Sequence, residues 1–424
     1  MSQSDERELL AEVAAYAADF LGSLDQRPIQ PTVEVDALRA ALGGPLPEGP
    51  TDAREVTRQL IDAAEPGVVA IPSGRYFGFV IGGELPVALA ADWLTALWDQ
   101  NSGLYVGGPS ASVVEEVAVD WLVELFGLPV GVSAGFVTGA QMAHFVALAA
   151  ARHHVLEQAG WDFLEDGLQG GPPIRVVVGE LRHVTIDRAL RLLGLGARQI
   201  ATVPTDTQGR MRPEALARVL ADGSGPTIVC AQAGEVNTGA FDRFPAIADA
   251  VREAGAWLHV DGAFGLWAAV SESRRHLVEG IERADSWATD AHKWLNVPYD
   301  SGLVFCAHPA AHRAAMGVQA SYLVHAEPGA ARDQMDWVPE FSRRARGFAV
   351  YAALAALGRS GVADLVDRCC EHASYFAELL SADPQVAVLN DVVLNQVLVR
   401  FGADDELTRD VVQAVQQDGT CFVS

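Results

Sequence analysis

Apolar residues recur with helical spacing at the start of the chain and again before its middle. Positions 5–22 form an amphipathic helical pattern that includes Leu9 and Val13, and positions 85–127 repeat this spacing. Between them, a Pro/Gly-rich stretch at 28–50 surrounds one short helix. Because this stretch has little core of its own, we expect it to wrap on another part of the protein or on a second subunit.

Short apolar runs alternate with helical patterns from about residue 130 to 305. Such alternation is typical of an α/β fold and predicts a mainly parallel sheet of the seven-stranded type, flanked by helices on both faces. The strands are predicted at 134–137, 174–178, 227–230, 257–260, 286–289 and 302–306. Helices are predicted between several of them, at 141–158, 186–193, 212–222 and 245–253.

The last quarter of the chain has a different pattern. A mostly helical segment is predicted at 343–380, followed by strands at 386–389 and 393–401. The irregular stretch 325–339 is polar and interrupted by Gly and Pro, which is typical of a mobile loop. We therefore expect three parts: an N-terminal helical arm (1–75), a large cofactor-binding domain (76–308) and a smaller C-terminal α+β domain (309–424).

Charge and composition limit the classes of partner. The 424 residues carry a formal net charge of −25, and half of them are apolar. Nucleic acids and anionic membranes require clustered cations, so we expect neither as a partner. No apolar run of about 18 residues lacks a charge or a helix breaker, so no membrane span is expected.

The cysteines indicate a reducing compartment. Their number, five, is odd, none shows CxxC spacing, and the polar start of the sequence does not resemble a secretory segment. We expect reduced thiols in a cytoplasmic protein.

Of the 30 lysine and arginine residues, only Lys293 is a lysine. A guanidinium cannot lose its proton under ordinary conditions, whereas an amine can do so and attack a carbonyl group. Lys293 is therefore a candidate for covalent bonding to a carbonyl compound. Codon bias that spared one lysine by chance is the alternative explanation.

Two further segments have the residue types that one cofactor would need. At 136–144 a strand leads through Gly139, Ala140 and Gln141 into a helix, whose free N–H groups can bind an anion. At 257–263 an apolar strand ends in Asp261. Taken alone, each has a structural alternative: the first also fits an ordinary α/β turn, and the second fits a helix-capping aspartate equally well. Together with Lys293 they suggest pyridoxal phosphate, which needs a phosphate site, an aldehyde partner and a charge opposite its ring nitrogen.

The histidines are less specific. His183 follows the predicted strand 174–178 and is placed to stack on a flat cofactor, although a loop histidine bonded to backbone is the more common case. The remaining histidines show no metal-ligand spacing, so we predict no metal site.

The segments His259-Val260-Asp261-Gly262-Ala263 and Asp290-Ala291-His292-Lys293-Trp294 together resemble the pyridoxal-phosphate-dependent group II amino-acid decarboxylases, which include the aromatic-amino-acid, glutamate and tyrosine decarboxylases. Weaker similarity extends from about residue 76 to the C-terminus. The resemblance implies the fold-type-I transferase-like architecture and a homodimer with its sites between the subunits.

The resemblance also implies roles for individual residues. Lys293 would hold the cofactor covalently, Asp261 would pair with the ring nitrogen and His183 would stack on the ring as the third catalytic residue. The phosphate would be bound by Gly139, Ala140 and Gln141. Further cofactor contacts are implied for Ala263, Asp290 and His292.

Three features depart from the family pattern. Glu235-Val236 stands where many members have a threonine beside the ring, which puts that contact in doubt. The stretch 325–339 has no tyrosine to return a proton, so the donor is unassigned. The family also extends beyond position 424, so we expect a truncated small domain.

The predicted function is decarboxylation of an L-amino acid to an amine and CO₂. Phe77, Phe79 and Trp93 hint at an aromatic or apolar substrate, but packing in the core explains them equally well. The alternatives are transamination, carbon–carbon lysis or aldehyde formation on the same scaffold, or a catalytically silent binding member. Trp294 after the lysine favours the decarboxylase, and the intact Lys293, Asp261 and His183 argue against a silent protein.

Overall fold

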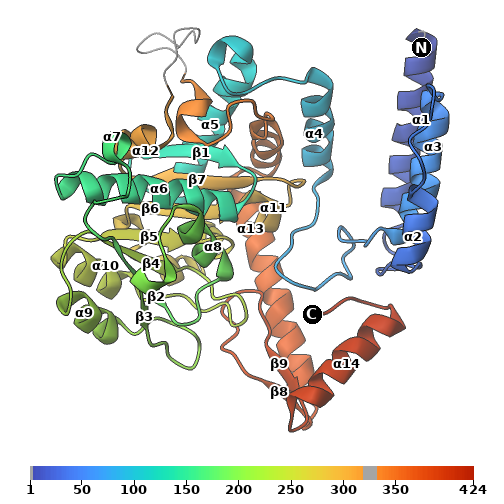
Figure 1. The fold of residues 1–424 in the computed structure, drawn as a ribbon. Coiled ribbons are helices and arrows are strands. Elements are labelled where there is room, and N and C mark those ends of the chain that lie inside the picture. Colours follow the sequence, from blue (N-terminus) through green and yellow to red (C-terminus); the bar gives the residue numbers. More distant parts are fainter. Residues whose placement is uncertain (1–2, 319–331) are drawn as a thin grey trace. The chain divides into compact units, whose positions relative to one another are not determined.

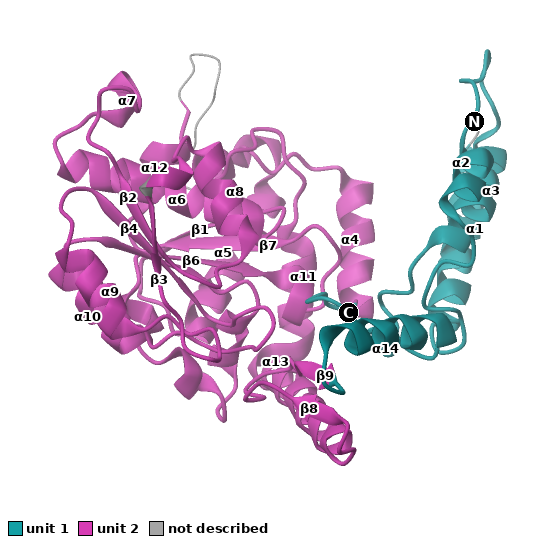
Figure 2. Cartoon of the chain, turned by 60° about the horizontal axis from the view of Figure 1, so that its bottom comes forward, with its two compact units in different colours: residues 1–83, 401–424 teal, residues 84–400 magenta. Residues whose placement is uncertain are grey.

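The computed structural model describes residues 3–318 and 332–424, and the chain divides into two compact units (Figure 2). One unit consists of Met1–Gly83 and Phe401–Ser424, and the other is Glu84–Arg400. The three-part division predicted from the sequence groups the C-terminal residues differently, and it stays a prediction.

A seven-stranded sheet forms the centre of the larger unit (Figure 1), and the predicted α/β class is confirmed. The strand order is β1-β7-β6-β5-β4-β2-β3, and only β7 runs antiparallel to its neighbours. Since β1 and β6 both oppose β7, all the other strands end at the same edge of the sheet. The strands are β1 (Ser133–Val137), β2 (Arg175–Gly179), β3 (Ile200–Val203), β4 (Thr227–Gln232), β5 (Trp257–Asp261), β6 (Ser286–Asp290) and β7 (Gly302–Cys306).

The central strands are buried on both faces, which explains their nearly continuous apolar sequence. Val176, Val177 and Val178 of β2 have no exposed surface. All six strands predicted in this region are present, and their ends shift by at most two residues. Strand β3 was missed because it is short and lies at the edge of the sheet, where Ile200 and Thr202 keep part of their surface exposed.

Helices cover both faces of the sheet (Figure 1). Helix α6 contacts β1, β4, β5, β6 and β7, so it lies across the middle of one face. The helices of this unit are α4 (Pro86–Trp98), α5 (Pro109–Phe126), α6 (Ala140–Gln158), α7 (Phe163–Asp166), α8 (Val184–Leu192), α9 (Pro213–Ala221), α10 (Phe244–Glu253), α11 (Ala291–Trp294), α12 (Pro309–Met316) and α13 (Gly347–Ser381). Short 3-10 turns are η2 (Tyr105–Gly107), η3 (Ala197–Gln199), η4 (Gly265–Val270), η5 (Arg275–Val278), η6 (Ile281–Arg283) and η7 (Gln334–Trp337).

Two glycines let β7 approach the turn between β1 and α6. A Cβ atom on Gly302 would lie 2.4 Å from the Cα of Gly139 and 2.5 Å from its carbonyl carbon. Backbone atoms cannot yield at that distance, so position 302 requires glycine. This close approach brings the start of α6 next to the ends of β6 and β7.

Helix α13 is long and apolar enough, by length and composition alone, to span a membrane, contrary to the expectation from the sequence. Its backbone leaves helical geometry at Gly358 (φ 61°, ψ 178°). The helix packs on α4 and α5, and its Arg359 pairs with Glu124 at 2.6 Å. The small two-stranded sheet of β8 (Val386–Val388) and β9 (Val399–Phe401) follows it, and β9 is shorter than predicted.

The smaller unit combines the two ends of the chain. Its helices are α1 (Gln3–Gly22), α2 (Val35–Leu42), α3 (Ala53–Ala64) and α14 (Asp405–Asp418), with the 3-10 turn η1 (Glu65–Gly67). The chain ends meet where Tyr76 stacks on Phe422, with ring centroids 4.8 Å apart and planes inclined by 2°. The Phe77 amide also donates to the Phe422 carbonyl at 2.8 Å.

Candidate active site

The residues predicted to act together lie at one edge of the sheet. Asp261 ends β5, Asp290 ends β6, and Lys293 lies in the short helix α11 that follows. His183 follows β2 as the N-cap of α8, and Gly139 lies between β1 and α6. Parallel strands bring their carboxyl ends to a common edge, where α/β sheets bind ligands.

Lys293 is held by an ion pair with Asp290. Its Nζ atom lies 3.1 Å from Asp290 Oδ2, and the other carboxylate oxygen, Oδ1, accepts the Ala140 amide at 2.6 Å. The Lys293 side chain retains 19% of its exposure, whereas that of Asp290 retains 4%. The amine is therefore accessible yet anchored, and Asp290 connects it to the N-terminus of α6.

Asp261 is a buried carboxylate whose charge is stabilised by its neighbours. Its Oδ1 accepts the Ala263 amide at 3.1 Å, and its Oδ2 lies 3.5 Å from His144 Nε2, at the outer limit of a hydrogen bond. Burial alone would raise the pKa of this carboxyl, but the His144 ring, the Ala263 amide and the Lys293 ammonium outweigh it and hold the pKa well below its usual range. Asp261 is thus a fixed negative charge.

His183 presents a neutral ring to the same edge. Burial lowers its pKa, and the nearby Lys293 ammonium lowers it further, against the opposing effect of Asp261. Its Nδ1 atom lies 2.8 Å from Thr185 Oγ1, and its amide donates to the Gln232 side chain at 3.1 Å. These contacts fix the ring in position, and its lowered pKa keeps it neutral.

The turn that precedes α6 has the features of an anion site. Gly139 and Ala140 lie at the helix start, where backbone N–H groups have no partner within the helix. The Gln141 side chain instead donates to the Thr185 carbonyl at 3.3 Å, and its buried Oε1 has no hydrogen-bond partner. Gln141 therefore joins α6 to α8 and leaves an acceptor unused at the site.

Ala263 and His292 complete the predicted set. The Ala263 carbonyl accepts the Asp290 amide at 2.9 Å, so this residue connects Asp261 to Asp290 through its backbone. His292 Nδ1 accepts the Ser301 amide at 3.1 Å, and its Nε2 lies 3.5 Å from Asp290 Oδ1. Burial lowers the pKa of His292.

Two buried residues of the site had no assigned role in the sequence. His144, in the first turns of α6, reaches Asp261, and Gln232, the last residue of β4, holds the His183 amide. Gln232 could have been found from the sequence, because it lies at the end of β4, and β4 is the neighbour of β5, which ends in Asp261. Periodicity could not assign His144, because a histidine inside a helix has no specific pattern.

Glu235, one of the departures from the family pattern, has a structural role. Its buried carboxylate accepts the amides of Asn237 and Thr238 at 2.9 and 2.8 Å. Val236 beside it is 37% exposed. The carboxylate therefore stabilises its own turn, and the position offers no hydroxyl group.

The predicted mobile loop 325–339 is only partly described. Residues 325–331 lie outside the described residues, so the prediction of a mobile loop stays untested there. From Arg332 onward the chain is packed into the domain: the Arg332 amide donates to Glu116 Oε1 at 2.8 Å and its guanidinium to the Ala134 carbonyl, and Gln334 is buried. Tyr322, three positions before the predicted loop, also lies outside the described residues.

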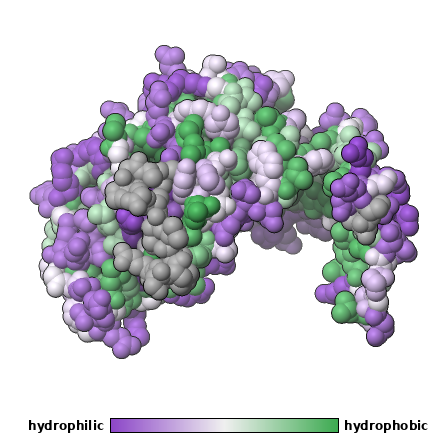
Figure 3. Space-filling view, turned by 90° about the horizontal axis from the view of Figure 1, so that it is seen from above, coloured by the Kyte–Doolittle hydropathy of each residue, from purple (hydrophilic) through white to green (hydrophobic). Residues whose placement is uncertain are grey.

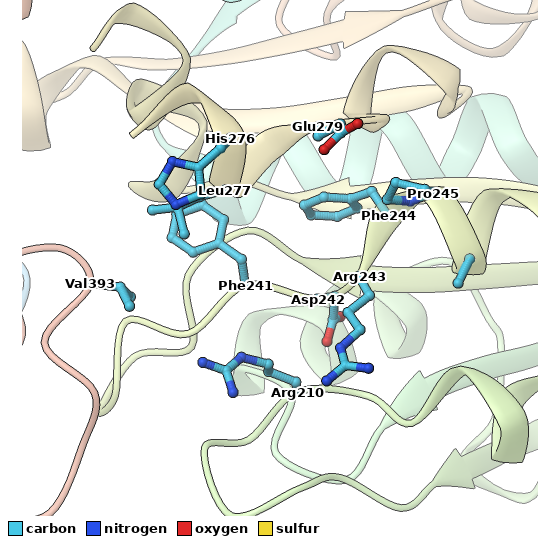
Figure 4. Close-up of a pocket in the computed structure, with 11 residues that line it drawn as sticks. Arg210, Phe241, Asp242, Arg243, Phe244, Pro245, His276, Leu277, Glu279 and Val393 are labelled. Carbon is cyan, nitrogen blue, oxygen red and sulfur yellow. The ribbon is translucent and has the colours of Figure 1, made fainter. Parts of the chain in front are cut away.

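A separate pocket contains none of these residues (Figure 4). Arg210, Asp242, Phe244, His276 and Glu279 are among its lining residues. The Asp242 carboxylate accepts the amides of Met211 and Gln232 at 2.6 and 2.7 Å, so it is occupied by backbone. No amine nucleophile lines this pocket.

The site fits pyridoxal phosphate on the observations made in this structure. Lys293 supplies an accessible amine, Asp261 a fixed negative charge and His183 a neutral ring. The N-terminus of α6 supplies N–H groups, and Gly302 packs closely on Gly139 at this helix start.

Comparison with known proteins also indicates a pyridoxal-phosphate site. The model of the pyridoxal-dependent decarboxylase conserved domain matches residues 37–402. The aromatic-L-amino-acid decarboxylase of Bacillus atrophaeus is 26% identical over 98% of this chain and 86% of its own length. The crystal structure of Oryza sativa TDC with PLP and tryptamine superposes with a TM-score of 0.93 at 24% identity, covering 100% of this chain and 91% of that one. The 4-hydroxyphenylacetaldehyde synthase of Rhodiola rosea has a TM-score of 0.88 at 22% identity and covers the same shares.

Proposed function

Because this chain belongs to the pyridoxal-dependent decarboxylase family, we propose that it releases CO₂ from an L-amino acid with an aromatic side chain. The enzyme is a carboxy-lyase and its cofactor is pyridoxal phosphate. One observation carries the proposal. The only lysine of the sequence lies in a sheet-edge site together with a buried, ionised aspartate and a neutral histidine.

When bound, pyridoxal phosphate supplies an electron-accepting ring that stabilises the negative charge left on the α-carbon as CO₂ departs. The chain supplies charge and position. Asp261 provides a fixed anion for the protonated ring nitrogen, and the His183 ring provides a flat, uncharged surface. The α6 N-terminus provides N–H groups for the phosphate, except for the Ala140 amide, which donates to Asp290.

Lys293 and Asp290 control the amine. Asp290 holds the protonated form of Lys293 at 3.1 Å. To act as a nucleophile the amine must lose a proton, and Asp290 and His292, whose Nε2 lies 3.5 Å from Asp290 Oδ1, are the groups next to it. Burial lowers the pKa of His292 and so keeps an unprotonated ring beside the pair.

The aromatic preference rests on the similarity to aromatic-L-amino-acid decarboxylases, and the sequence hint from three aromatic side chains does not strengthen it. Phe77, Phe79 and Trp93 keep 59%, 70% and 44% of their surface exposed. Packing in the core of this chain therefore does not explain them, contrary to the alternative considered from the sequence.

Product analysis tests the proposal. The purified protein, loaded with pyridoxal phosphate, should release CO₂ and form the matching amine from tryptophan, tyrosine or phenylalanine. Lys293→Arg serves as the matched inactive control. An aldehyde with ammonia, or a keto acid, in place of the amine would identify a different reaction, and release from glutamate alone would refute the aromatic preference.

We also propose a homodimer. The helices α1, α2 and α3 bury none of their residues within one chain, and Leu10, Val56 and Leu60 are 63%, 47% and 58% exposed. Figure 3 shows apolar surface, in green, among the polar surface of this unit. Side chains of this kind and number are normally covered in solution, and a second copy would cover them.

A cytoplasmic location is the last part of the proposal. All five cysteines are free thiols, two of them in the pair Cys369-Cys370, as expected in a reducing compartment. Fractionation of the source cells, followed by detection of the protein, tests this.

A further inference from the structure

A row of buried polar side chains runs from Asp261 into the core of the larger unit. Trp257, His259 and Asp261 alternate along β5 and therefore share one face of the sheet. His144 reaches this face from α6, and Ser286 reaches it from β6, where it pairs with His259 in the register. His144, His259 and Ser286 have no exposed surface, and Trp257 has 2%.

Each neighbour in this row is within hydrogen-bond distance of the next until the last step. Trp257 Nε1 lies 2.9 Å from Ser286 Oγ, and Ser286 Oγ lies 2.9 Å from His259 Nδ1. His259 Nε2 lies 2.9 Å from His144 Nδ1. His144 Nε2, which has no nearer partner, lies 3.5 Å from Asp261 Oδ2.

Accounting for donors and acceptors fixes the direction of every bond. The Trp257 indole can only donate, so Ser286 Oγ accepts from it and has one proton left to give. The acceptor for that proton is His259 Nδ1, which places the ring proton of His259 on Nε2. His259 then donates to His144 Nδ1, and the remaining proton of His144 lies on Nε2 and points at Asp261.

The reverse direction fails at both ends. It would leave the Ser286 hydroxyl proton without an acceptor in the buried row, and it would direct a lone pair of His144 at the Asp261 carboxylate. Both faults cost free energy in a buried site. Burial also lowers the pKa of His259 to about 3, so this ring is neutral and can donate from only one nitrogen.

We propose that His144 and His259 are positioning residues, which hold the Asp261 carboxylate ionised and oriented toward the cofactor ring nitrogen through a one-directional hydrogen-bond chain that begins at Trp257. This inference rests on the proposed function and adds residues to it that do not touch the cofactor. Asp261 Oδ1 is already occupied by the Ala263 amide. The His144 Nε2–H points at Oδ2 from 3.5 Å, so it favours the ionised carboxylate in this orientation.

The hydrogen-bond chain also couples the positions of two parts of the site. His144 lies in the second turn of α6, the helix whose N-terminus offers N–H groups to the phosphate. The same helix thus sets the position of the phosphate end and, through His144, the orientation of the carboxylate at the ring-nitrogen end. A shift of α6 would alter both contacts together.

The first test needs no cofactor. Long-range ¹H–¹⁵N NMR of the histidine side chains in the unliganded protein reports which ring nitrogen carries the proton. We expect His144 and His259 both as neutral rings protonated on Nε2. A neutral Nδ1–H form of either, or a doubly protonated His144, would overturn the chain.

The second test uses pyridoxal phosphate labelled with ¹⁵N in the ring and bound to the protein. His144→Leu should move the ring-nitrogen signal toward the unprotonated value and weaken cofactor binding by about ten- to a hundredfold, as expected for loss of one hydrogen bond to a charged group. His144→Gln keeps a donor toward Asp261 and should restore most of the signal. The control is His312→Leu, since His312 is also buried but bonds Ser133 and the Trp337 carbonyl instead.

The outcomes separate this inference from the proposed function. If His144→Leu leaves the ring-nitrogen signal unchanged, or if His312→Leu moves it equally, the positioning role is wrong while the decarboxylase can stand. If the unmutated protein does not bind pyridoxal phosphate, the proposed function fails. The tautomers of His144 and His259 in the unliganded protein still decide whether the hydrogen-bond chain is present.

Discussion

Replacing Asp261 with asparagine should reduce catalysis far more than it reduces stability. Asparagine fills the same space and can still accept the Ala263 amide, which donates to Oδ1 at 3.1 Å. It carries no charge, so it cannot hold a buried, protonated ring nitrogen. The side-chain amide of asparagine could also face His144 in two ways. It would point either its NH₂ group at the His144 N–H, which places two donors together, or its uncharged oxygen, which is a weaker acceptor than a carboxylate.

The magnitude follows from the burial of the site. Asp261 is 6% exposed, so little water can replace the missing charge. Breaking a buried ion pair by removal of one partner costs about 3–5 kcal/mol. If that amount appears in the transition state, turnover falls about a hundred- to a few thousandfold. In the cofactor-free protein the change weakens the contacts to His144 and the Ala263 amide, which corresponds to about 1–3 kcal/mol of unfolding free energy.

The assay compares turnover with unfolding in the same preparations. CO₂ release under cofactor saturation gives the first quantity, and urea unfolding of the cofactor-free protein gives the second. Asp285→Asn is the control, because Asp285 accepts the Leu258 amide at the other end of the same strands and pairs with His308 at 2.7 Å. Turnover of Asp261→Asn within about threefold of the unmutated enzyme, or equal losses in both aspartate variants, would refute the assigned role.

Three further predictions follow from the same structure. Lys293→Arg should keep the charge opposite Asp290 and the fold, but abolish turnover and covalent cofactor attachment, which absorbance after dialysis and thermal unfolding together would show. Leu60→Glu, on a helix that buries none of its residues, should convert the dimer to monomers in light scattering, whereas Glu55→Gln on the same helix should not; a dimer that survives Leu60→Glu contradicts the proposed interface. Burial raises the pKa of Asp242 from 3.8 to about 6, so the contribution of this group to stability is present below about pH 4 and is lost as pH rises through 6. Relative to Asp242→Asn, the unmutated protein should lose up to about 3 kcal/mol of unfolding free energy over that range. Parallel pH profiles of the two proteins would contradict this prediction.

The sheet and its site edge could be predicted from the sequence because both depend on local patterns. Continuous apolar runs such as Val176-Val177-Val178 require burial on both faces, and strand ends place Asp261 and Asp290 at one edge. The single lysine identified a candidate nucleophile, and the structure places it beside Asp290. Edge strand β3 escaped because half-exposed, short strands have no strong pattern.

The contacts that adjust the site were not predictable in the same way. The pairing of Asp290 with Lys293 joins residues three positions apart, but its bond to the Ala140 amide spans 150 positions. The approach of His144 to Asp261 likewise depends on how α6 lies on β5. Such contacts arise from tertiary packing, which hydrophobic periodicity does not encode. The mobile loop predicted for 325–339 differs from the structure from Arg332 onward, because polar composition does not reveal that Arg332 bonds the Ala134 carbonyl and that Gln334 is buried.

The most direct test of the account is to find where the cofactor attaches. The unmutated protein, loaded with pyridoxal phosphate and reduced with borohydride, would be digested and its peptides mapped by mass spectrometry. The account predicts a single pyridoxyl group, on Lys293, and none in Lys293→Arg. A pyridoxyl group elsewhere, such as on the N-terminal amine, with Lys293 unmodified would contradict the assignment of this site.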